Sequence, residues 1–265
     1  MRSTVEVLRE IAGYGDRYYV WVLSEPAHRR EELKSDSWAS LRFWFDHAFY
    51  QGRTDAVSGI IEGRALNALE SRLRTDPCEW DSALRNLDMD GWLSREKWED
   101  EANPVQQALR EQKVNKRYDR LLVLSSLAFA VETGHLSIVR WAVEEIEKGN
   151  LTRVHCRLDQ LASVGDKIAS FFLRDLVDLF ELRRHVAPED ARLLQPVDVW
   201  VRRIVKRVGL AGDSATDDEV KRAIVEKCSD MNTDGIRFNQ GAFYLGFRAA
   251  DILLEQICGD AQAEN

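Results

Sequence analysis

The chain has 265 residues, a formal net charge of −8 and a pI near 5.3. Its 5 prolines and 15 glycines favour a helical protein over a turn-rich sheet protein, and its length is enough for one domain or two packed lobes. Neither a long apolar run nor an apolar signal core at the N-terminus is present, so we expect a cytoplasmic protein without membrane association.

Apolar residues recur at helical spacing through most of the chain and predict an all-α fold. The second of the expected helices is unusually aromatic, and a Gly-Asn pair at 149–150 is expected to end the fifth. A charged connection and an acidic loop are expected to separate the later helices. The expected helices before the middle of the chain cover 3–12, 37–50, 56–73, 118–132 and 136–148.

The cysteines and histidines show no metal-ligand spacing. Cys78, Cys156, Cys228 and Cys258 are far apart and form no Cys-x-x-Cys pair, and the five histidines are equally dispersed. This pattern argues against a zinc ribbon or an iron–sulphur loop. We therefore expect reduced thiols and neither a bound metal nor another cofactor.

Lys167 lies where a lysine can become a nucleophile. It follows the sequence Leu-Ala-Ser-Val-Gly-Asp at 161–166 and leads into an apolar helix that begins with Ile168. Burial disfavours the ammonium form, and a neutral amine can attack carbon and form a Schiff base. The alternative is a solvated charge in the first turn of a helix, which is the usual position of a lysine.

Asp198 is the second candidate. It follows Pro196 and precedes apolar residues at helical spacing from Val201 to Val208, so we expect it to be the N-cap of a helix. An aspartate that serves only as a helix cap contributes about 1 kcal/mol to stability. Together with Lys167, however, it provides the amine and the carboxylate needed to cut a bond at the anomeric carbon of a sugar.

These motifs resemble those of the helix-hairpin-helix base-excision DNA glycosylases, the superfamily of endonuclease III and 8-oxoguanine DNA glycosylase. That family carries its lysine in a Leu-Pro-Gly-Val-Gly-x-Lys hairpin and its aspartate in a Pro-Val-Asp setting. Here Ala162 and Ser163 replace the proline and the first glycine, while Lys167 and Asp198 stand in the family's positions. The segment 238–244 is similar to a later helix of the oxoguanine enzymes, and the resemblance covers about 140–250.

The resemblance implies a two-lobed helical fold with a cleft between the lobes. Residues 40–184 would form a helical barrel lobe with the hairpin and Lys167, and residues 1–39 plus 185–265 would form the second lobe with Asp198. It also implies a monomeric DNA N-glycosylase with AP-lyase activity on double-stranded DNA. The damaged or modified base would be extruded from the duplex, and an oxidised purine is the first expectation.

Further site residues are expected to contact the DNA backbone or the extruded base. Aromatic rings stack on bases, and amides can contact their edges or fill the gap they leave. The backbone-binding candidates are Val164, Gly165, Arg202, Arg203 and Lys206. The base-pocket or wedge candidates are Trp44, Phe49, Gln51, Trp200, Asn239, Gln240 and Phe243.

The acidic net charge opposes the DNA interpretation, since DNA binders normally have a basic surface. The basic cluster at 202–207 would have to form a basic cleft on an acidic body. Two alternatives remain open at this point. An N-glycosidase for a free modified nucleoside or nucleotide would release base from a nucleotide and ignore an oligonucleotide. A non-catalytic helical binding module would retain its biological activity after Lys167→Ala.

Overall fold

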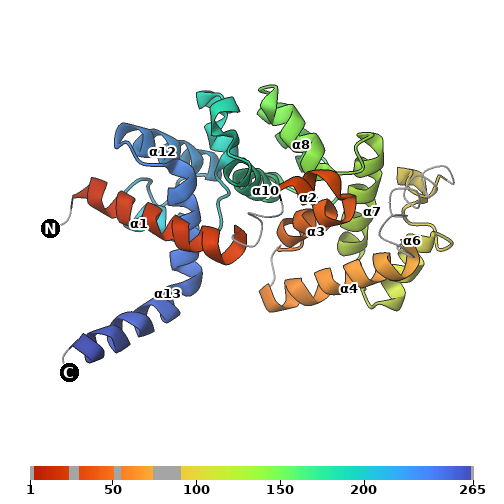
Figure 1. The fold of residues 1–265 in the computed structure, drawn as a ribbon, viewed down its shortest axis with the longest axis horizontal. Coiled ribbons are helices and arrows are strands. Elements are labelled where there is room, and N and C mark those ends of the chain that lie inside the picture. Colours follow the sequence, from red (N-terminus) through yellow and green to blue (C-terminus); the bar gives the residue numbers. More distant parts are fainter. Residues whose placement is uncertain (1–2, 24–29, 51–54, 74–90, 264–265) are drawn as a thin grey trace. The chain divides into compact units, whose positions relative to one another are not determined.

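The computed structural model describes residues 3–23, 30–50, 55–73 and 91–263, and every regular element in these ranges is helical (Figure 1). The all-α prediction is therefore confirmed. The chain divides into two compact units, with unit 1 comprising Met1–Ala27 and Ala187–Asn265 and unit 2 comprising His28–Val186. None of the described helices combines the length and the apolar character that a membrane span requires.

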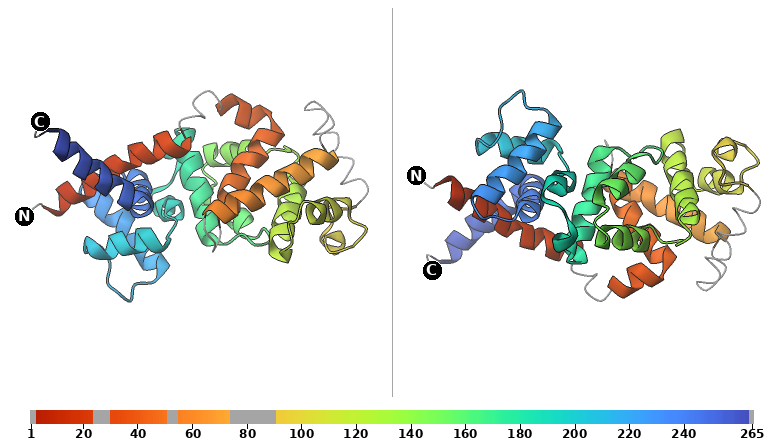
Figure 2. Two further views of the ribbon diagram at one scale, coloured as in Figure 1. Left: turned by 90° about the horizontal axis from the view of Figure 1, so that it is seen from below. Right: turned by 90° about the horizontal axis from the view of Figure 1, so that it is seen from above.

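Unit 2 comprises the helices that come between the two segments of unit 1 in the sequence, and Figure 2 shows these helices in two views. Side-chain caps begin several of them. Asp36 accepts hydrogen bonds from the amides of Trp38 and Ala39 at the start of α3, and Asn103 caps α6, which has Pro104 as its first residue. The helices of unit 2 are α2 (Arg30–Ser35), α3 (Ser37–Ala48), α4 (Asp55–Leu73), the 3₁₀ helix η4 (Arg95–Lys97), α6 (Pro104–Glu111), α7 (Arg117–Glu132), α8 (Ile138–Glu147), α9 (Leu151–Asp159), α10 (Asp166–Leu179) and the 3₁₀ helix η5 (Leu182–His185).

Helix α10 is a central element of unit 2 and contacts α3, α8 and α9. Its Phe172 is fully buried and meets the ring of Trp44 edge-on, with 5.0 Å between the ring centroids. The indole N–H of Trp44 donates to Ser126 Oγ on α7 at 2.8 Å. The aromatic segment predicted at 37–50 thus becomes the core-forming helix α3, because its rings pack against α7 and α10.

A buried polar network links α3 to α10. Asp175 is fully buried; one carboxylate oxygen accepts from Arg174 Nε at 2.8 Å, and the other lies 3.1 Å from His47 Nε2. His47 Nδ1 lies 2.8 Å from the Phe43 carbonyl. Burial alone would raise the pKa of the Asp175 carboxyl, but the charge of Arg174 and the hydrogen bond with His47 outweigh it and hold that pKa well below its usual range.

Unit 1 is organised around the crossing of α1 and α13, which the views of Figures 1 and 2 both show. A Cβ on Gly241 would lie 1.8 Å from the Ile11 carbonyl oxygen, and one on Gly15 would lie 2.5 Å from the Arg237 carbonyl oxygen. Glycine is needed at both positions because the two backbones touch. The helices of unit 1 are α1 (Thr4–Tyr18), the π-helix η1 (Tyr19–Leu23), the 3₁₀ helix η6 (Pro188–Leu194), α11 (Val199–Arg207), α12 (Asp217–Asp230) and α13 (Gly235–Ala263).

The first helix differs from its prediction. Ser3 and Glu6 form a capping box at its start, but the helix continues to Tyr18 and passes into a π-helix that ends at Leu23, well beyond the expected end at 12. Gly13 and Gly15 weaken the local helical pattern, and Gly15 permits the close contact with α13. The unit 1 core consists of Leu8, Ile11, Val197, Val201, Val205, Val220, Ile224, Cys228, Phe238 and Ala242.

Candidate functional site

The segment expected to form the hairpin consists of two helices, α9 and α10, joined by residues 160–165. Ser163 adopts a left-handed conformation with φ 65°, at the position where the glycosylase hairpin has glycine. Its Oγ donates to the Tyr118 carbonyl at 3.0 Å, and the Ala162 amide donates to Ser125 Oγ at 3.2 Å. Contacts with α7 therefore support a turn conformation that serine adopts at an energetic cost of about 1–2 kcal/mol.

Lys167 is the second residue of α10 and is half-buried. Ile168 and Ala169 after it are buried, so the helix leads into the core as expected. His155 on α9 lies on the other side of the hairpin, and its Nε2 is 3.3 Å from Asp166 Oδ1 and 3.3 Å from Ser170 Oγ. His155 thus joins α9 to the first turns of α10 at positions one residue before and three residues after Lys167.

The two hairpin residues predicted to bind the DNA backbone differ in their availability. The Val164 amide donates to the Leu161 carbonyl at 3.0 Å, so it is used within the turn itself. Gly165 is exposed and is the N-cap residue of α10. The first amides of a helix attract anions, but the Asp166 carboxylate also lies in this first turn and competes electrostatically with a phosphate there.

Asp198 is the N-cap of α11, as predicted. Its Oδ1 accepts from the Val201 amide at 2.7 Å, and the side chain is half-buried. In the part of the chain that the structure describes, Oδ2 has no hydrogen-bond partner. One oxygen of the carboxylate is therefore used to hold the helix, and the other is available to a ligand. Asp198 belongs to unit 1, whereas Lys167 belongs to unit 2.

The two amides predicted to contact a base lie inside unit 1. Asn239 is fully buried and donates from Nδ2 to the Pro196 carbonyl at 3.2 Å. Gln240 is also fully buried, and its Oε1 is 3.5 Å from Arg237 Nη1. Their burial argues against direct contact with a base, because both side chains are directed to the protein interior. Gln51, the third amide candidate, lies outside the described residues.

The aromatic candidates also have packing roles. Trp44 and Phe49 are fully buried in unit 2, so neither ring offers a face for stacking on a base. Trp200 is half-buried in unit 1; its Cβ would be 2.4 Å from a Cβ on Gly246, and the guanidinium of Arg203 lies 5.0 Å from its ring centre. Aromatic residues at helical spacing occur both in buried cores and in binding sites. The sequence therefore did not distinguish a core ring from a site ring.

A partly exposed aromatic cluster in unit 1 includes residues that the sequence analysis missed. Trp21 is 42% exposed and stacks on Phe247, which is 37% exposed, with 5.2 Å between the ring centroids. The predicted Phe243 also stacks with Phe247, with 6.0 Å between the ring centroids, and the Arg248 guanidinium lies 4.8 Å from the centre of the Trp21 ring. The exposed Val-Trp-Val stretch at 20–22 lies in the π-helix, an element often found at functional sites.

The basic face of α11 is partly neutralised by the acidic loop at 213–217. Arg202 forms an ion pair with Asp217, and Lys206 Nζ donates to the Asp213 carbonyl at 2.6 Å and lies 3.6 Å from its carboxylate. Arg203, the third predicted phosphate ligand, is exposed. Of the three, Arg203 is therefore the most accessible to a phosphate.

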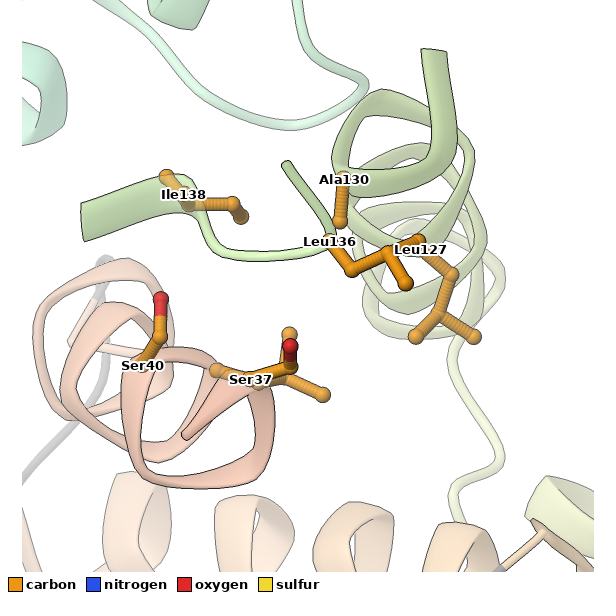
Figure 3. A pocket seen from close by; sticks show the side chains of 7 residues that line it. Ser37, Ser40, Leu127, Ala130, Leu136 and Ile138 are labelled. Atoms are coloured by element: carbon orange, nitrogen blue, oxygen red, sulfur yellow. The ribbon is translucent and has the colours of Figure 1, made fainter. Parts of the chain in front are cut away.

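Two concavities formed by described residues contain little reactive chemistry. In unit 2, a shallow gap between α3 and α7 is lined by Ser37, Ser40 and apolar side chains (Figure 3), and none of these described lining residues is titratable. In unit 1, a groove of about 550 Å³ lies between η6 and α12. Its Asp218 pairs with both Arg192 and Arg222, at 3.1 and 2.9 Å, so both arginines that line this groove have an acidic partner.

Unit 2 also contains a carboxyl pair that the sequence analysis did not identify. Glu62 on α4 is buried and hydrogen-bonded to Asp46 on α3. Burial, and then the charge of Asp46 and the hydrogen bond with it, raise the pKa of Glu62 from 4.5 to about 9. The pair is therefore held together by a proton on Glu62 at neutral pH.

Glu62 is expected to make the stability of unit 2 pH-dependent. In the native protein the Glu62 carboxyl retains its proton up to about pH 9, whereas in the unfolded chain it loses the proton near its ordinary pKa. The contribution of Glu62 to the free energy of unfolding is therefore fully present at low pH and is lost as the pH rises between these two values. The slope within this window is at most about 1.4 kcal/mol per pH unit. Urea unfolding between pH 5 and pH 9 would measure it. Glu62→Gln, which keeps a donor to Asp46, should remove this component; an unchanged slope in that variant would contradict the assignment.

Within the described ranges, no group of three or more histidine, cysteine, aspartate or glutamate side chains is arranged to hold a metal ion. Cys156 and Cys228 are free thiols, and burial raises the pKa of the Cys228 thiol to about 12. Comparison of the chain with protein-family models, with curated proteins and with solved structures gave no match.

Proposed function

We propose that the chain is a DNA N-glycosylase with AP-lyase activity that removes a damaged or modified base, with an oxidised purine as the first candidate. One observation carries the proposal. The chain has, in order, a helix–turn–helix with Lys167 in the first turn of its second helix, and then Asp198 capping the next α-helix after Pro196. This is the arrangement that the resemblance to the helix-hairpin-helix glycosylases implies.

The chemistry assigns one role to each residue. The Lys167 amine attacks the anomeric carbon while the bond to the base breaks, and the base leaves with the bonding electrons and takes up a proton. Asp198 stabilises the positive charge that builds on the sugar, through the oxygen not used by the helix cap. Loss of the amine proton and opening of the sugar ring give an imine, which permits β-elimination of the 3′ phosphate.

The partial exposure of Trp21 and Phe247 supports a nucleobase as the ligand. Their rings are partly exposed and stacked in the described structure, and Arg248 lies over both. Stacking of a base on an aromatic ring contributes about 1–3 kcal/mol and tolerates any base, because every base has a π-face. This cluster therefore fits the recognition of a base better than the fully buried rings of Trp44 and Phe49.

The pairing of Arg202 and Lys206 with the acidic loop favours a second candidate, an N-glycosidase for a free modified nucleotide. A small substrate requires few phosphate contacts, and this candidate retains the same lysine and aspartate chemistry. The two candidates differ in the size of the substrate alone, so one assay separates them.

Borohydride trapping tests both candidates. The purified protein is incubated with duplexes that each carry one modified base, with matching undamaged duplexes and with free modified nucleotides, and sodium borohydride is added to reduce any imine to a stable amine. The DNA proposal expects a covalent protein–DNA adduct with at least one lesion duplex and none with the undamaged control. Base release from nucleotides alone would support the second candidate, and the absence of both products would refute the catalytic proposal.

Removing an acidic partner of α11 is expected to strengthen DNA binding. Asp217→Asn deletes the carboxylate that pairs with Arg202, so the guanidinium can contact a phosphate. We expect duplex affinity to rise by about threefold to tenfold at low salt, and the slope of log K against log salt to steepen by about one. Fluorescence anisotropy across a salt series measures both.

Asp230→Asn is the matched control for Asp217→Asn. It changes the net charge equally at the other end of α12, where Asp230 lies 3.8 Å from Lys227. If both variants bind DNA equally, the effect comes from overall charge, and the competition between Asp217 and phosphate for Arg202 is refuted.

A further inference from the structure

The segment before Asp198 is buried against α13. Gln195 and Val197 are 1% and 7% exposed, and Pro196 between them is also buried. The Asn239 amide, itself fully buried, donates to the Pro196 carbonyl at 3.2 Å from the second turn of α13. This hydrogen bond joins positions 43 residues apart in the chain. A side chain of α13 thus holds the backbone two residues before the proposed catalytic carboxylate.

In the described structure, other polar contacts add little to the stability of residues 195–197. The Gln195 amide N–H donates to the Arg192 carbonyl at 3.1 Å, but Gln195 Oε1 is buried and has no hydrogen-bond partner in the described structure. A buried acceptor without a partner costs about 1–3 kcal/mol. The side-chain oxygen of Gln195 therefore does not help to fix this segment. The hydrogen bond from Asn239 to the Pro196 carbonyl is correspondingly more important for holding the backbone of residues 195–197.

The position of Asp198 depends on this backbone. Its Oδ1 is occupied by the Val201 amide at 2.7 Å, so the carboxylate can move only with the start of α11. The Pro196 carbonyl lies two residues before it and is fixed by Asn239. A shift of that carbonyl would displace Oδ2, the oxygen without a hydrogen-bond partner in the described structure. Displacement of a catalytic group by about 1 Å can reduce a rate by about a hundredfold.

We infer that Asn239 is a positioning residue for Asp198, which fixes the carboxylate through the Pro196 carbonyl and does not itself contact the base. This inference rests on the proposed glycosylase function. It explains why a fully buried polar amide stands at a position of α13 that faces the apolar core of unit 1. It also reassigns Asn239 from the base-contacting role expected from the sequence.

The test uses the two reactions of the proposed enzyme. Excision of a base needs both Lys167 and Asp198, whereas β-elimination at an abasic site made beforehand needs the Lys167 amine. Asn239→Leu removes the donor and keeps a similar volume. We expect its single-turnover excision rate to fall by about tenfold to a hundredfold, and its rate of strand cleavage at the abasic site to stay within about twofold of the wild-type rate. Asp198→Asn should show the same pattern.

The matched control is Gln240→Leu, which removes a neighbouring amide of equal burial on the same helix and keeps the Asn239 donor to the Pro196 carbonyl. We expect both of its reactions to stay close to the wild-type rates. Equal losses of excision and β-elimination in Asn239→Leu would show that Asn239 only maintains the fold, and would overturn the inference. Asn239→Ser, smaller and still polar, replaces Asn239→Leu if that variant is recovered only as aggregate.

Hydrogen exchange at the Val201 amide separates failure of the inference from failure of the proposed function. This amide is held by Asp198 Oδ1, so a displaced aspartate exposes it. We expect at least tenfold faster exchange in Asn239→Leu than in Gln240→Leu. If the wild-type protein catalyses neither reaction, the proposed function is refuted; faster exchange then still supports the link from Asn239 to Asp198, and unchanged exchange overturns it.

Discussion

Lys167→Gln is expected to abolish the borohydride adduct and to reduce strand cleavage at an abasic site by a factor on the order of 10³ or more. The amide of glutamine is not a nucleophile and forms no imine. Because Lys167 is half-buried in the first turn of α10 and is not part of the buried core, glutamine should leave the fold intact. Gel analysis of borohydride-treated reactions measures the adduct, and circular dichroism checks the helical content.

Lys148→Gln provides the control for this prediction. Lys148 belongs to the same unit, is 60% exposed and pairs with Glu145 at 2.9 Å, so its loss removes an equal charge before α9 and outside the turn that precedes Lys167. The adduct should persist in this variant. An adduct that survives in Lys167→Gln would show that another amine attacks the sugar, and the role assigned to Lys167 would then be wrong.

The second large effect is expected from Asp175→Ala, which should destabilise the protein by about 3–5 kcal/mol in urea unfolding at neutral pH. The change leaves the guanidinium of Arg174, only 1% exposed, without its carboxylate, and it removes the partner of His47 Nε2. Removing the partner of a buried charge is among the most costly effects of a single substitution. The low pKa of Asp175 also means that its contribution is present above the ordinary carboxyl range and is lost as pH falls.

Asp178→Ala, one turn later on α10, is the control. Asp178 is also buried, but its partner Arg183 is 41% exposed and regains contact with water when the carboxylate is removed. We therefore expect a loss of stability less than half that of Asp175→Ala. Equal losses would contradict the view that burial of the guanidinium, rather than the pairing itself, determines the cost.

The local features of the chain were predictable because they depend on neighbouring residues. Asp198 caps α11, α10 begins just before Lys167, and the aromatic segment at 37–50 forms a helix. Each follows from a cap, a turn or a helical period within a few positions. The left-handed backbone at Ser163 was not predictable, since serine does not favour it; it depends on hydrogen bonds from residues 162 and 163 to α7.

The roles of individual side chains within those helices were decided by tertiary contacts. Helical spacing does not distinguish an apolar face that packs in the core from one that contacts a ligand. For this reason Trp44 was predicted to be a base-pocket residue although it is buried, whereas Trp21 was not predicted although it is 42% exposed. Likewise, the bond from Asn239 to Pro196 joins residues far apart in the chain. The sequence by itself determined the all-helical fold and the helix starts that carry Lys167 and Asp198, because these are local properties; burial and polar partners were decided only by the packing of distant segments.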